Sequence, residues 1–124
     1  MLENNYKNDT KKIGEKGESI ATDFLKRKGY KIIERNFFCK QGEIDIVAKK
    51  EEEYIFCEVK TRRNFKYGEP RDSVNYIKKK HMWDATKYYV YKNNLYNKNI
   101  RFDVIEVYIY NRGNYINHIK NIAI

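Results

Sequence analysis

Apolar side chains recur at three- and four-residue steps in two segments of the chain, which predicts two amphipathic helices. The first is expected over residues 11–29, with a buried face made of Ile13, Gly17, Ile20, Ala21, Phe24 and Leu25. Gly29 suits the C-terminal end of this helix, and the polar residues 1–10 are expected to be frayed. The second helix is expected over residues 73–91, with Asp72 or Ser73 as the N-cap and one face made of Val74, Ile77, His81, Ala85 and Tyr88.

Five other segments alternate apolar and polar residues between turn signals, which is typical of β-strands. They are residues 30–38, 43–48, 54–61, 101–110 and 115–119. Short turns join the first three strands into an antiparallel meander, and the second helix permits a crossover to the fourth strand. The pattern therefore predicts an α/β fold in the order α-β-β-β-α-β-β, with one central mixed sheet flanked by helices.

The length of 124 residues fits a single domain, expected over residues 11–124. The net charge of +9 favours a polyanionic partner, either nucleic acid or an acidic membrane surface. The sequence contains no lipidation signal, amphipathic basic helix or apolar segment long enough to span a bilayer, so a membrane is not expected. Cys39 and Cys57 form no C-x-x-C pair and the N-terminus lacks a secretory signal, which favours a cytoplasmic protein with reduced cysteines.

Two neighbouring strands carry carboxylates that would lie close together. Strict alternation along the second strand turns Asp45 away from both Ile44 and Ile46, and along the third strand Glu58 shares a face with Lys60. If the strands pair, Asp45 and Glu58 lie roughly 5 Å apart. Two carboxylates at that separation repel unless a cation or a proton lies between them, so the pattern is typical of a site for a hard divalent metal ion.

These residues suit a metal-dependent phosphodiesterase. Asp45 and Glu58 would ligate Mg²⁺ or Mn²⁺ with the Val59 carbonyl as a third oxygen, and Lys60 would polarise the attacking water or stabilise charge on the phosphate. Glu18, on the first helix, would bind a metal-ligated water or a second metal. The expected nucleic-acid-binding rim around this acidic centre consists of Arg35, Arg62, Arg63, Lys66, Lys78, Lys79 and Lys80.

Each of these positions also has an ordinary structural interpretation. A Glu-x-Lys pair on a strand is usually a solvated ion pair, and Glu18 lies on a helix rich in charge. The lysines at 78–80 would then be a solvated helix face. His81 and His118 lack ligand spacing, so core or surface roles are expected for both.

Six short motifs follow one another between residues 14 and 104: Gly14-Glu15-Lys16-Gly17-Glu18-Ser19-Ile20-Ala21, Gly29-Tyr30, Arg35-Asn36, Gly42-Glu43-Ile44-Asp45, Phe56-Cys57-Glu58-Val59-Lys60-Thr61-Arg62 and Arg101-Phe102-Asp103-Val104. Together they resemble the YraN-like family of bacterial proteins, which is similar to archaeal Holliday junction resolvases. The resemblance implies a restriction-endonuclease-like core. It also implies that Glu18, Asp45, Glu58 and Lys60 take the catalytic positions.

The sequence thus predicts an endonuclease that hydrolyses phosphodiester bonds in DNA, branched or otherwise structured, with Mg²⁺ or Mn²⁺ as cofactor. One alternative is a non-catalytic nucleic-acid-binding protein that kept the nuclease fold, and another is an RNA-processing nuclease. A homodimer is also expected, because a two-fold symmetric junction needs two active sites.

Overall fold

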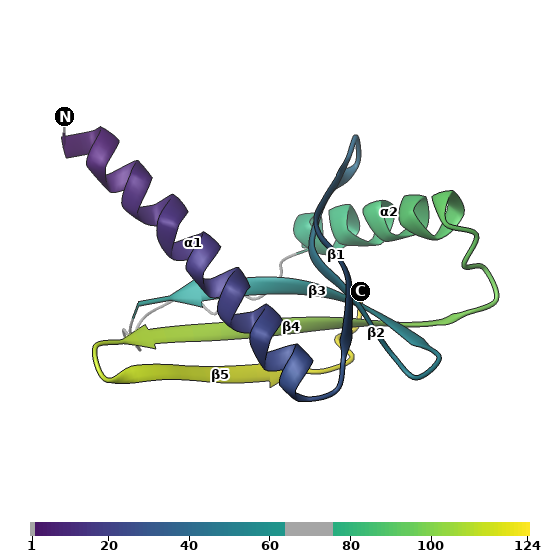
Figure 1. Cartoon of the computed structure of the whole chain (residues 1–124). Helices are drawn as coiled ribbons and strands as arrows, with labels where there is room; N and C mark the ends of the chain where they lie inside the picture. The colour runs from purple at the N-terminus through teal and green to yellow at the C-terminus, as the bar shows by residue number, and fades with distance from the viewer. Residues whose placement is uncertain (1, 64–75) are drawn as a thin grey trace.

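A computed structural model describes residues 2–63 and 76–124, with side chains from residue 10 onward. The elements are α1 (Leu2–Arg27), β1 (Lys31–Cys39), β2 (Gly42–Lys50), β3 (Glu53–Arg62), α2 (Tyr76–Lys92), β4 (Asn99–Tyr110) and β5 (Gly113–Ile119) (Figure 1). The predicted order α-β-β-β-α-β-β is confirmed.

The strands form a five-stranded sheet in the spatial order β1-β2-β3-β4-β5. β3 pairs with β4 in parallel, and the other neighbouring pairs are antiparallel. A parallel pair cannot be joined by a tight hairpin, so the connection that contains α2 makes the crossover. The sheet is therefore mixed, as the sequence predicted for a restriction-endonuclease-like core.

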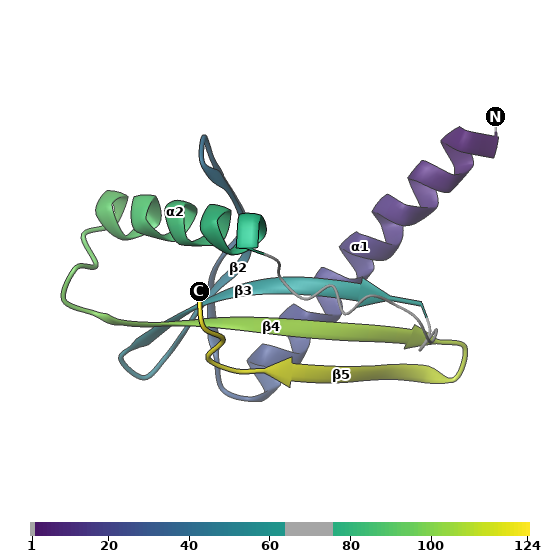
Figure 2. The same cartoon turned by 180° about the vertical axis from the view of Figure 1, so that it is seen from behind.

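The two helices cover opposite faces of the sheet, and each face has its own hydrophobic core (Figures 1 and 2). Cys57 and Phe56, which are consecutive on β3, belong to different cores, as alternation along a strand requires. The core under α1 contains Ala21, Leu25, Tyr30, Ile46, Ala48, Ile55, Cys57, Ile105 and Val107. The core under α2 contains Phe37, Ile44, Val47, Phe56, Met82, Ala85, Tyr89, Leu95, Phe102 and Val104.

Helix α1 begins at Leu2, well before the predicted start near residue 11. Its N-terminal turns extend beyond the strands, so they have no sheet beneath them to select a periodic apolar stripe (Figure 1). The C-terminal end matches the prediction. Gly29 has a left-handed φ of 91°, and Tyr30 N donates to Leu25 O at 2.9 Å, which closes a Schellman motif.

The predicted face of α2 is only partly the buried one, because Ala85 is buried as expected and its other described members are not. The buried residues are Met82, Ala85, Thr86 and Tyr89, whereas Ile77, His81 and Tyr88 are exposed. The helix carries aromatic side chains around much of its circumference, so more than one stripe satisfies the three- and four-residue spacing. Asp72, Ser73 and Val74 lie outside the described residues.

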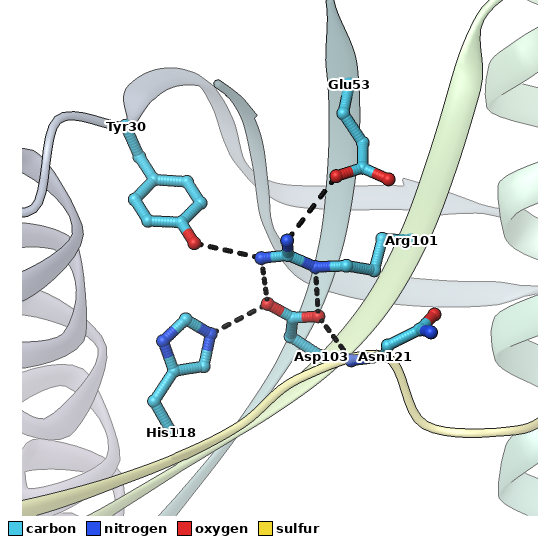
Figure 3. A network of polar contacts seen from close by, with 6 residues as sticks. All are labelled: Tyr30, Glu53, Arg101, Asp103, His118 and Asn121. Carbon is cyan, nitrogen blue, oxygen red and sulfur yellow. Dashed lines mark hydrogen bonds and ion pairs between the residues drawn. The ribbon is translucent and has the colours of Figure 1, made fainter. Parts of the chain in front are cut away.

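A buried network of ion pairs and hydrogen bonds joins the strands at the half of the sheet where β3 begins (Figure 3). Asp103 on β4 is fully buried, and Arg101 donates to both of its carboxylate oxygens, at 2.9 and 2.8 Å. His118 on β5 lies 2.7 Å from Asp103, and the backbone N–H of Asn121 donates to it at 3.0 Å. Arg101 also donates to the Tyr30 hydroxyl and to Glu53. The network therefore joins β3, β4, β5 and the segment that follows α1.

The buried carboxylate of Asp103 makes this network sensitive to acid. Burial by itself would raise its pKa, but hydrogen bonds from His118, Arg101 and the Asn121 backbone outweigh burial and lower the pKa to about 2. A carboxylate with a lowered folded-state pKa contributes stability above its unfolded pKa of about 4 and loses it as the pH falls toward 2.

We expect Asp103→Asn to lower the free energy of unfolding by about 3 kcal/mol at pH 7, because it leaves Arg101 without its buried counter-charge. Urea denaturation from pH 7 to pH 2 measures this. The wild type should lose stability between pH 4 and pH 2 more steeply than the variant. Asp23→Asn, at an exposed position on α1, should behave as wild type. Equal pH profiles for wild type and Asp103→Asn would contradict the prediction.

Candidate active site

The site lies where the ladder between β2 and β3 stops. Backbone pairing runs from Lys50↔Glu53 to Ile46↔Cys57, so Asp45 and Glu58 are the next residues on the two strands. Both residues are buried, with 7% and 6% of their total surface exposed. The Val59 backbone N–H donates to Asp45 Oδ2 at 2.8 Å. A side-chain carboxylate thus accepts a backbone hydrogen bond where the regular ladder has ended.

The expected alternation of β2 is wrong at this point. Ile44 packs in the core under α2 and Ile46 in the core under α1, although they were predicted to share a face. On β1, Arg35 pairs with Ile46 and Phe37 with Ile44, so Asn36 lies opposite Asp45. Asn36 has a left-handed φ of 52°, a conformation that Asn tolerates better than most residues. The irregular backbone at Asn36 therefore accompanies the break in alternation at Asp45.

A pocket of about 430 Å³ opens between this part of the sheet and α2. It is lined by Gly42, Glu43, Asp45 and Glu58 from the sheet and by Ile77, Lys78, His81 and Met82 from α2. Lys78 Nζ lies 2.5 Å from Glu58 Oε1, and Lys60 Nζ lies 3.9 Å from the same oxygen. Asp45, Glu58 and Lys60 are therefore brought together as the sequence predicted, and Lys78 joins them from the helix.

The proximity of the carboxylates changes the acidity of Asp45. Burial and the negative charge of Glu58 raise the pKa of Asp45 to about 8, although the Val59 N–H opposes the shift. Glu18 and Glu43 raise it further. A carboxyl group with this pKa binds a proton readily near neutral pH, which is the behaviour expected where acidic groups gather to receive a cation.

Glu18 lies next to this group, on the α1 side of the sheet. The pKa of Glu18 is raised overall, chiefly by burial and further by the negative charges of Glu43 and Glu58. A hydrogen bond from Asn36 and the charge of Arg35 oppose this shift. Glu18 Oε1 is 3.9 Å from Arg35 Nη2. Glu18 lines a second pocket, of about 410 Å³, together with Thr10, Ile13, Gly14, Val59, Thr61 and Arg63. The Val59–Asp45 hydrogen bond connects the linings of the two pockets.

Gly17 allows α1 to bring Glu18 this close to β3. A Cβ added at Gly17 would overlap the Thr61 side chain, because it would lie only 2.8 Å from the Cβ of Thr61. Glycine is unfavourable inside a helix by about 1 kcal/mol relative to alanine, so close packing against β3 is the physical reason for a glycine here.

The predicted basic rim is only partly directed at the site. Arg35 pairs with Glu18, and Arg62 Nε lies 3.7 Å from Glu106 on β4. Arg63 is exposed and lines the Glu18 pocket, and Lys79 is half-buried on α2. Lys66 lies outside the described residues.

Sequence reasoning missed the place of Lys78, which contacts Glu58 inside the pocket. No signal in the sequence distinguishes Lys78 from its two neighbouring lysines, since the contact depends on how α2 packs. His81 is exposed, within the predicted range of roles, and its position on the pocket wall was not predicted.

The donor set fits Mg²⁺ better than a metal that needs a full protein cage. Within residues 10–63 and 76–124, no three His, Cys, Asp or Glu side chains come close enough together to hold a metal ion. Mg²⁺ is usually held by one or two carboxylates and keeps several waters. Asp45 and Glu58 supply two carboxylates, and the ammonium of Lys78 already lies against one of them.

Comparison with known proteins assigns the chain to a family. The model of the uncharacterised protein family UPF0102 matches residues 17–107. A UPF0102 protein of Clostridioides difficile is 50% identical over 113 residues, which cover 91% of this chain and 97% of that protein. This chain belongs to the UPF0102 family. A relative from Caldicellulosiruptor saccharolyticus is 43% identical over 113 residues, covering 90% and 96% of the two chains.

The UPF0102 match spans Glu18, Asp45, Glu58 and Lys60, together with Arg101 and Asp103 of the buried network. The YraN-like resemblance is therefore confirmed. The family is uncharacterised, so membership assigns no reaction. Neither helix, over the residues described, is both long and apolar enough to cross a bilayer.

We expect Gly17→Ala to lower the free energy of unfolding by about 1–2 kcal/mol, because the cost of overpacking against Thr61 exceeds the gain in helix propensity. Urea denaturation measures the change. Gly14→Ala is the matched control on the same helix. A Cβ there meets nothing within 4 Å, so this variant should gain up to about 1 kcal/mol. If both variants gain stability, the close contact at Gly17 is refuted.

We expect Asp45→Asn to make the metal-free protein more stable than wild type at pH 9, by at least about 1 kcal/mol. A carboxyl group with a raised folded-state pKa contributes stability at low pH and loses it as the pH rises from about 4 to about 8. Thermal or urea unfolding in EDTA from pH 5 to pH 9 tests the difference. Asp23→Asn, at an exposed position on α1, should retain the wild-type profile. An Asp45→Asn variant less stable than wild type at pH 9 would contradict this assignment.

Proposed function

We propose that this chain is a metal-dependent endonuclease that hydrolyses phosphodiester bonds in DNA. The observation that carries the proposal is the proximity of Asp45 and Glu58 just beyond the end of the β2–β3 ladder, with Lys60 Nζ 3.9 Å from Glu58. Two buried, ionised carboxylates side by side destabilise a fold unless a cation or a proton lies between them. A purely structural role gives no reason to retain such a pair.

Each residue has a defined task in this proposal. Asp45 and Glu58 would hold Mg²⁺ or Mn²⁺, with the Val59 carbonyl as a further oxygen. When bound, the cation would supply Lewis acidity to the scissile phosphate and the attacking water. Lys60 would orient that water or stabilise the negative charge that develops on the phosphate. Glu18 would accept a hydrogen bond from a water in the neighbouring pocket.

The charge of the chain supports a polyanionic substrate. The net charge is +9, and among the described residues that line the acidic pocket Lys78 is the one lysine or arginine, so most of the positive charge lies outside this pocket. Arg63, which is exposed and lines the Glu18 pocket, and Lys79, which is half-buried next to Lys78 on α2, would contact the DNA backbone. Branched or structured DNA, a homodimer and a cytoplasmic location remain predictions from the sequence and from the resemblance to junction resolvases.

We expect wild type to bind Mn²⁺, and Asp45→Asn and Glu58→Gln to bind it at least about tenfold more weakly, because each variant removes one charged ligand. Isothermal titration calorimetry without nucleic acid measures the dissociation constants. Glu51→Gln, at the exposed tip of the β2–β3 hairpin, removes one negative charge away from the pocket and should bind as wild type. Equal affinities in all four proteins would remove the support for a metal-dependent enzyme.

A cleavage assay with Mn²⁺ on four-way junctions, flaps, single strands and structured RNA then distinguishes the candidates. The proposal requires DNA cleavage that is lost in Lys60→Ala. Cleavage that survives in Lys60→Ala would indicate a contaminating nuclease. DNA binding without cleavage, in a protein that binds no Mn²⁺, would instead identify a non-catalytic binding protein with this fold.

A further inference from the structure

Helix α2 inserts one positive charge into the acidic pocket. Lys78 Nζ lies 2.5 Å from Glu58 Oε1, closer than Lys60 Nζ, which lies 3.9 Å from the same oxygen. The Lys78 side chain is 44% exposed, whereas that of Glu58 is 8% exposed. The lysine therefore reaches a buried carboxylate from the open side of the pocket, along a flexible stem that can turn back into solvent.

Close packing between α2 and the start of β2 sets the position of Lys78. Gly42, the first residue of β2, lies against His81. A Cβ at Gly42 would be 3.3 Å from both the Cβ and the backbone oxygen of His81. Met82, the next residue of α2, is buried in the core. Lys78 is one helical turn before His81 and Met82 and lines the same pocket, so α2 holds it over Glu58.

The negative charges around Glu58 explain why the ammonium of Lys78 lies against it. Asp45 and Glu58 repel one another, and Glu43 lines the same pocket. An ammonium against Glu58 offsets part of this repulsion in the absence of metal. A divalent cation needs the same carboxylate oxygens and repels the ammonium, so the two cannot both remain in direct contact with Glu58 at low energy.

We propose that Lys78 is a built-in counter-ion of the carboxylate pair, displaced when the divalent metal binds and then available to contact a substrate phosphate at the mouth of the pocket. This inference rests on the proposed function, because it takes Asp45 and Glu58 as the metal ligands. The proposal gives different roles to Lys60 and Lys78, the two lysines near Glu58. Lys60 lies on the same strand as the ligand, while Lys78 exchanges between the carboxylate and the phosphate.

Two opposite effects of one substitution test the proposal. Lys78→Met keeps the length of the side chain and removes its charge, so the metal no longer has to displace a cation. We expect Mn²⁺, titrated by calorimetry without nucleic acid, to bind Lys78→Met about tenfold more tightly than wild type. At saturating Mn²⁺, single-turnover cleavage of DNA by the same variant should be slower than by wild type. Lys78→Gln, which is shorter and also neutral, should change both quantities in the same directions.

Lys87→Met is the matched control, because it removes one positive charge from a 58% exposed lysine of the same helix that pairs with Asp84 rather than with Glu58. Its Mn²⁺ affinity should equal that of wild type. If Lys78→Met and Lys78→Gln bind Mn²⁺ no more tightly than wild type, while wild type binds and cleaves, the counter-ion proposal is overturned and the proposed function stands. If wild type binds no Mn²⁺ and cleaves no DNA, the proposed function fails, and this inference fails with it.

Discussion

The repulsion between Asp45 and Glu58 is the constraint around which the site is arranged. The two carboxylates are buried next to one another, just beyond the end of the β2–β3 ladder. The protein compensates in several ways. The Val59 N–H donates to Asp45, the Lys78 ammonium contacts Glu58, and the raised pKa of Asp45 allows a proton to stay bound near neutral pH. Each compensation is partial, and a metal ion between the carboxylates would replace the last two.

Two glycines let both helices approach this point from opposite faces of the sheet. Gly17 brings α1 against Thr61 and places Glu18 beside the site, while Gly42 brings α2 against β2 and places Lys78 in the pocket. The main stabilising network lies close by, because its centre, Asp103, pairs with Cys57, the residue directly before Glu58. The ion-pair network centred on Asp103 joins β3, β4, β5 and the segment after α1 (Figure 3). The stabilising network and the candidate site therefore lie on neighbouring residues of the same sheet.

The strands, their order along the chain and the placement of Asp45 and Glu58 on neighbouring strands follow from sequence patterns, because alternation and turn residues act locally. The proximity of Glu58 and Lys60 is such a case. The break in alternation at Asp45 does not follow, since it accompanies the left-handed backbone of Asn36 on the neighbouring strand. The contact of Lys78 with Glu58 does not follow either, because an aromatic-rich helix offers several faces for packing and tertiary contacts select one.

The most direct test of this account is to locate Mn²⁺ by paramagnetic broadening of backbone amide signals in the ¹⁵N-labelled protein. Mn²⁺ well below one equivalent should broaden the amides of Asp45, Glu58 and Val59 first. The amide of Lys92, at the end of α2 opposite to Lys78 and the pocket, should remain sharp. Broadening concentrated at the exposed hairpin tip around Glu51, or spread evenly over all acidic residues, would show that the carboxylate pair is not a metal site.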